Sequence, residues 1–60
     1  MCSLARRKLL QTIQECQQAL ELLEKGDERK AIGCIDEAEF QLEGAKWILI
    51  NDVIEREGRL

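Results

Sequence analysis

Apolar residues recur at helical spacing in both halves of the chain. In the first half, residues spaced four, three, four and three positions apart form one row: Leu9, Ile13, Cys16, Leu20 and Leu23. In the second half, a comparable row contains Ala31, Ile35, Ala38, Leu42, Ala45 and Leu49. Alternating spacings of three and four place such residues on one side of an α-helix, as in a coiled coil. The pattern predicts two helices that pack against each other through these rows.

Gly26 and Asp27 are expected to form the turn between the two helices. Ser3 is a candidate N-cap, so the first helix is predicted over about residues 4–25, with Gly26 ending it in a left-handed conformation. Asp27 can cap a second helix, predicted over about residues 28–57. Residues 1–60 are therefore predicted to form a single all-α domain, an antiparallel two-helix hairpin.

A second apolar arc on the later helix lies outside its packing row, and one partner helix cannot cover an apolar surface this wide. Because the second helix is longer, residues 50–57 would extend about 12 Å beyond the first, at about 1.5 Å per residue. We predict that this second arc is an interface. It either joins two hairpins in a two-fold, homodimeric four-helix bundle or contacts a different protein, and we favour the dimer. The predicted interface residues are Phe40, Trp47, Ile50, Val53 and Ile54.

The composition lacks most residues on which catalysis and metal binding depend. The 60 residues include no histidine and no tyrosine. The three cysteines, Cys2, Cys16 and Cys34, form no CxxC pair, so no zinc site is predicted. Unpaired cysteines are typical of a reduced, cytoplasmic protein, in which Cys16 and Cys34 would be buried thiols.

Acidic residues on the second helix are interpreted as a solvated face. Asp36, Glu39 and Glu43 can lie close together, but carboxylate metal sites in helical bundles also use histidine. We therefore expect no catalytic residue, no metal and no cofactor. The longest apolar run, residues 47–50, is far shorter than the roughly 20 residues that span a membrane, which favours a soluble protein.

One face of the first helix carries Arg7, Gln11, Gln14 and Gln18. Arginine binds phosphates and glutamine can bond base edges or sugars, so this strip is a candidate nucleic-acid contact. In size, in its single turn and in its two apolar rows, the chain resembles the Rop-type RNA-binding hairpin. That resemblance implies a homodimeric four-helix bundle that contacts RNA through these four residues.

The net charge of −3 gives no general attraction to nucleic acid. We therefore expect a small non-enzymatic regulator, inhibitor or adaptor that acts as a dimer through protein–protein contacts with an unknown partner. The alternative is a Rop-like dimer that binds RNA through the first helix.

Overall fold

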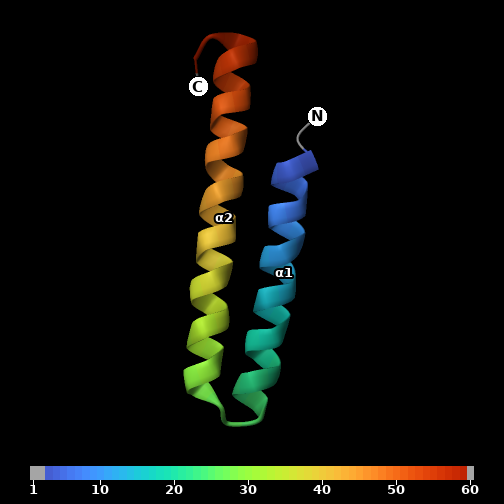
Figure 1. Cartoon of the computed structure of the whole chain (residues 1–60), viewed down its shortest axis with the longest axis vertical. Coiled ribbons are helices and arrows are strands. Elements are labelled where there is room, and N and C mark those ends of the chain that lie inside the picture. The colour runs from blue at the N-terminus through green and yellow to red at the C-terminus, as the bar shows by residue number, and fades with distance from the viewer. Residues whose placement is uncertain (1–2, 60) are drawn as a thin grey trace.

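The computed structural model describes residues 3–59 and consists of two antiparallel α-helices joined by a short turn (Figure 1). α1 spans Ser3–Glu24 and α2 spans Glu28–Glu57. The predicted all-α hairpin is confirmed. α1 begins and ends one residue earlier than expected, with Ser3 already inside the helix, whereas α2 has the expected bounds.

Local interactions at the turn reverse the chain. Gly26 has a φ of 80°, a left-handed conformation that glycine adopts without steric cost. The backbone N–H of Asp27 donates to the Leu22 carbonyl oxygen at 2.8 Å, and that of Gly26 donates to the Leu23 carbonyl oxygen at 3.0 Å. This pair of hydrogen bonds is a Schellman motif, which satisfies carbonyls at the end of α1. The Asp27 carboxylate then accepts from the Lys30 N–H at 3.3 Å and caps α2.

The two helices touch through alanines. Five alanines are only 1 to 6% exposed, and no large side chain in residues 3–59 is fully buried. Small side chains let the two helix axes approach closely, but each contributes little apolar area to a core. The buried residues are Ala5, Ala19, Ala31, Ala38 and Ala45.

The predicted packing row of α1 is wrong. Its four large residues, Leu9, Ile13, Leu20 and Leu23, are 39 to 62% exposed. The half-buried side chains of α1 lie one position earlier in the sequence, at Lys8, Thr12, Glu15 and Leu22. Two helices touch along a single line, and small residues give the closest approach along it. The large residues then flank that line on one side.

The packing row of α2 is correct only in part. Its alanines are buried, but Ile35, Leu42 and Leu49 are 41 to 50% exposed. Cys16 is also exposed and Cys34 is half-buried, so the expectation that both thiols are buried is wrong.

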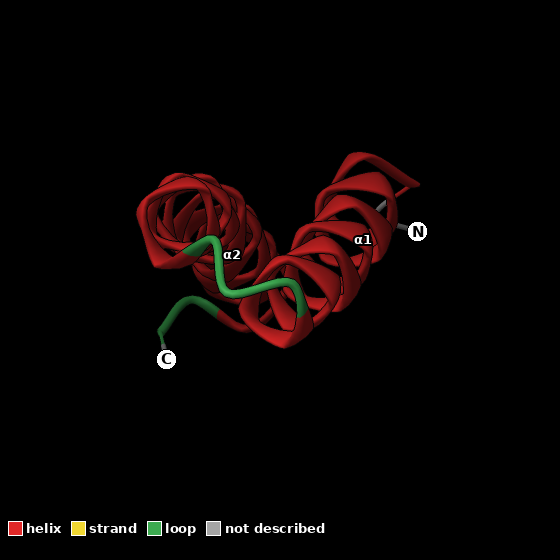
Figure 2. Ribbon diagram, turned by 90° about the horizontal axis from the view of Figure 1, so that it is seen from below, coloured by secondary structure: helices red, strands yellow, loops and turns green. Residues whose placement is uncertain are grey.

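The described Cα atoms extend over 47 × 15 × 11 Å, which is a single layer of two rods. Seen along their axes, the helices lie side by side with both broad sides of the pair open (Figure 2). α2 extends beyond the start of α1 at the end opposite the turn (Figure 1). Neither helix has an apolar stretch that could cross a membrane within the described range.

Candidate interaction surfaces

One broad side of the hairpin carries large apolar residues from both helices. Two shallow hollows on this side share Leu9 and Leu49; Ile13 lines the first and Leu42 lines the second. Residues three, four or seven positions apart share one side of a helix, so the remaining members of both rows face the same way. We call this surface the leucine face: Leu9, Ile13, Leu20, Leu23, Ile35, Leu42 and Leu49.

The structure places the five predicted interface residues on two sides of α2. Ile50 and Val53 are half-buried and line a hollow of the leucine face. Phe40, Trp47 and Ile54 are exposed and spaced seven residues apart. Phe40 and Trp47 each lie two positions after a buried alanine that contacts α1, namely Ala38 and Ala45. At about 100° per residue, this puts them almost opposite α1.

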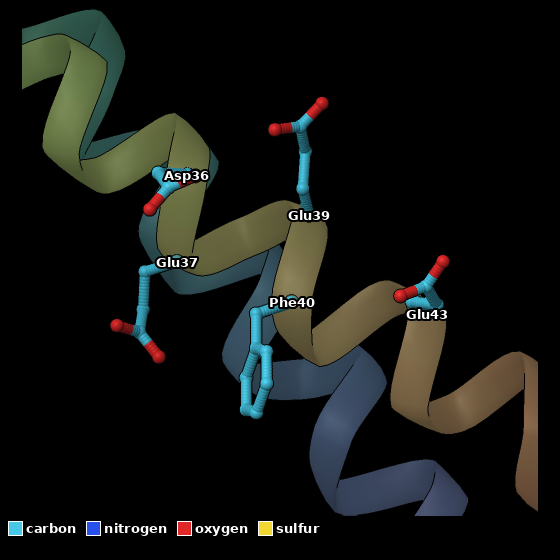
Figure 3. A pocket seen from close by; sticks show the side chains of 5 residues that line it. All are labelled: Asp36, Glu37, Glu39, Phe40 and Glu43. Atoms are coloured by element: carbon cyan, nitrogen blue, oxygen red, sulfur yellow. The ribbon is translucent and has the colours of Figure 1, made fainter.

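Phe40 lies among four carboxylates on this outer surface of α2 (Figure 3). Its ring and the Glu37 side chain extend to one side of the helix, whereas Glu39 points the other way. Together these residues line a shallow hollow built by α2 alone. Phe40 is 69% exposed, the highest value among the large apolar residues of the described chain. We call this surface the Phe40 patch: Asp36, Glu37, Glu39, Phe40 and Glu43.

Most of the carboxylates in the Phe40 patch have no partner among the described residues. The Gln41 amide Nε2 donates to Glu37 Oε2 at 3.4 Å, a long hydrogen bond between exposed groups. Asp36, Glu39 and Glu43 make no hydrogen bond or ion pair within residues 3–59. In the same range, no three histidine, cysteine, aspartate or glutamate side chains are grouped as metal ligands.

Trp47, seven residues beyond Phe40, already contacts a cation. The Lys46 Nζ atom lies 5.7 Å from the centre of the indole ring, within the range of a cation–π interaction. The indole remains 53% exposed. Trp47 therefore differs from Phe40, whose surroundings are acidic.

The four residues of the predicted nucleic-acid strip are all exposed on α1. Arg7 and Gln11 border a shallow hollow that Lys8 and Gln41 also line. Gln11 Nε2 donates to Glu15 Oε2 at 3.2 Å, and Lys8 Nζ donates to Gln41 Oε1 at 3.4 Å. The structure therefore brings Arg7 and Gln11 together at one hollow, but not Gln14 and Gln18.

Cys34 faces α1 at the helix contact. Its partial burial and the nearby Glu15 carboxylate, which also forms a hydrogen bond with the thiol, raise the pKa of Cys34. A raised pKa leaves less of the reactive thiolate at neutral pH. Nothing in this arrangement activates Cys34 as a nucleophile.

Comparisons with protein-family models, with curated proteins and with solved structures find no match. The function must therefore be inferred from these surfaces.

Proposed function

We propose that the protein is a small non-enzymatic interaction protein that acts through protein–protein contacts as a homodimer. Its leucine face packs on the leucine face of a second copy, which forms a four-helix bundle. One observation carries this proposal: the fully buried side chains within residues 3–59 are all alanines, while seven large apolar residues from the two helices share one open side.

The energetics favour covering that side. A domain of 60 residues is marginally stable alone, because it buries only about 60% of the surface that its unfolded chain exposes. Complete burial stabilises a leucine or isoleucine side chain by about 1.5–3 kcal/mol relative to exposure. Covering seven half-exposed side chains would contribute as much as the total stability of many small domains, about 5–15 kcal/mol.

The dimensions also suit a dimer. α1 has 22 residues and is about 33 Å long, and two helices side by side are about 20 Å wide. This broad side therefore has an outline of about 660 Å² before side-chain relief is counted. A standard interface buries about 800 Å² on each partner. All seven members of the leucine face are uncharged, and the charged residues that border its hollows carry both signs: Arg6, Lys46, Asp52 and Arg56.

Sedimentation equilibrium tests the dimer. We expect a mass twice that of the 6.9 kDa chain at micromolar concentration, with helicity that falls on dilution because folding and association are coupled. A Leu49→Ala variant should dissociate at a higher concentration than the wild type, whereas Trp47→Ala, at an exposed position almost opposite α1, should not. A wild-type chain that stays fully helical as a monomer would contradict the proposal.

RNA binding through α1 is the second candidate. The observation that favours it is the exposure of Arg7, Gln11, Gln14 and Gln18, which lie away from the leucine face and would stay accessible in the dimer. Binding of a stem–loop RNA should weaken with salt, and Arg7→Ala should lower both the affinity and the salt slope. Arg29→Ala, an exposed arginine on α2, is the matched control. Absence of binding at low salt would remove this candidate.

A further inference from the structure

We propose that the Phe40 patch is a docking site for a cationic amphipathic helix of another protein. This inference goes beyond the homodimer, because Phe40 lies almost opposite α1 and outside the leucine face. The expected partner presents lysine or arginine residues beside an apolar side chain that packs on Phe40.

Charge complementarity defines this partner. Residues 36–43 contain four carboxylates and neither lysine nor arginine. Glu39 and Glu43 are four positions apart on the helix, where like charges repel each other. Asp36, Glu39 and Glu43 have no partner within the described part of the chain. A cationic partner would relieve this repulsion and form charge-assisted hydrogen bonds with all three.

The same charges exclude other occupants. A second copy of the chain would bring identical carboxylates together in a two-fold contact around Phe40. Nucleic acids and anionic lipid surfaces would be repelled for the same reason.

The aromatic ring supplies the apolar part of the site. Phe40 is 69% exposed, and Asp36 and Glu43 lie about one helical turn before and after it along α2. An apolar side chain of the partner can bury this ring while its lysines or arginines reach the carboxylates. Aromatic anchors of this kind often dominate the energy of an interface.

A synthetic amphipathic helix of leucine and lysine is the probe, and a helix of leucine and glutamate with the same pattern is its control. Binding is followed by the fluorescence anisotropy of the labelled peptide. The wild type should bind the lysine peptide and not the glutamate peptide. An Asp36→Asn, Glu43→Gln double variant removes the carboxylates one turn before and one turn after Phe40, and it should bind the lysine peptide about tenfold more weakly.

A matched double variant separates local charge from net charge. Glu21→Gln with Glu24→Gln removes the same charge from exposed positions on α1 and should change affinity less than about twofold. Phe40→Ala should weaken binding about as much as the patch variant does. Equal loss in both double variants, no effect of Phe40→Ala, or binding of the glutamate peptide would each overturn the proposal.

Sedimentation equilibrium on the same variants keeps the two proposals separate. All of them should retain the mass of the wild type, since none alters the leucine face. Loss of peptide binding with an unchanged mass assigns the effect to the Phe40 patch. If a patch variant lost both, Phe40 or its carboxylates would belong to the dimer interface, and the docking proposal would be wrong.

Discussion

The leucine face and the Phe40 patch are two apolar surfaces of the same helix with different surroundings. Leu42 and Phe40 are only two residues apart and both are largely exposed, at 50% and 69%. Leu42 lies in a hollow lined by Leu9 and Leu49, whereas Phe40 lies among four carboxylates. An uncharged apolar surface can meet its own copy, while an apolar residue surrounded by one sign of charge favours a different partner of the opposite sign.

The comparison also shows why the net charge says little about partners. The total of −3 is small, yet residues 36–43 hold four negative charges and no positive one. Charge acts over about 8–10 Å at moderate salt, so the local arrangement decides which partner a surface attracts.

The largest expected difference is in the free energy of unfolding when a lysine is substituted on each of the two surfaces. Leu42→Lys would bury a charge in the proposed four-helix bundle and should lower the free energy of unfolding by about 3 kcal/mol or more. Phe40→Lys should change it by less than about 0.5 kcal/mol, because the new lysine stays in solvent and lies one turn from Asp36 and Glu43.

Urea unfolding followed by circular dichroism, at one fixed protein concentration, measures both variants. The wild type and a Trp47→Lys variant serve as references, since Trp47 is exposed but lies in neither surface. Equal destabilisation by Leu42→Lys and Phe40→Lys would mean that the two surfaces do not differ in burial.

The hairpin itself is predictable because its determinants are local. Gly26 provides the left-handed residue, Asp27 caps α2, and both act through neighbours within five residues. Helix-forming residues on either side need no distant partner to favour a helix. These interactions place the turn and the bounds of α2 without any knowledge of packing.

The side of each helix that forms the contact is harder to predict. A row of leucines indicates a surface that needs cover, but not whether the other helix or another chain covers it. A usable signal is present in the alanines: Ala31, Ala38 and Ala45 are seven residues apart, and Ala5 and Ala19 are fourteen apart. Small residues at heptad spacing on both helices indicate a close helix contact.

The sequence pattern places the five predicted interface residues on one wide arc for a similar reason. Periodicity alone groups Ile50 and Val53 with Phe40 and Trp47, because all lie outside the alanine row. Only the position of α1 shows that Ile50 and Val53 adjoin the leucine face while Phe40 and Trp47 point outward. The direction of the neighbouring helix, rather than the amount of apolar surface, divides the arc.

The smallest expected effect is on the reactivity of Cys34 at the contact between the two helices. This contact belongs neither to the leucine face nor to the Phe40 patch. Glu15→Gln removes a charge that raises the pKa of Cys34, so more thiolate should form near pH 8. Alkylation of Cys34, followed by peptide mass spectrometry, should then accelerate by no more than a few-fold, because burial, the larger cause of the shift, is unchanged. Glu21→Gln, on the outer side of α1, should leave the rate as it is in the wild type.

The raised pKa of Cys34 also makes the stability of the folded chain depend on pH. The folded chain holds the Cys34 proton more tightly than the unfolded chain, so this contribution is present at neutral pH. It is lost as the pH rises from the ordinary thiol pKa, about 8.5, through the raised value. Glu15→Gln should therefore make the free energy of unfolding fall less between pH 7 and pH 9.5 than it does in the wild type. An unchanged pH dependence together with an unchanged alkylation rate would mean that Glu15 does not reach Cys34 in solution, and that the helix contact differs from the one described.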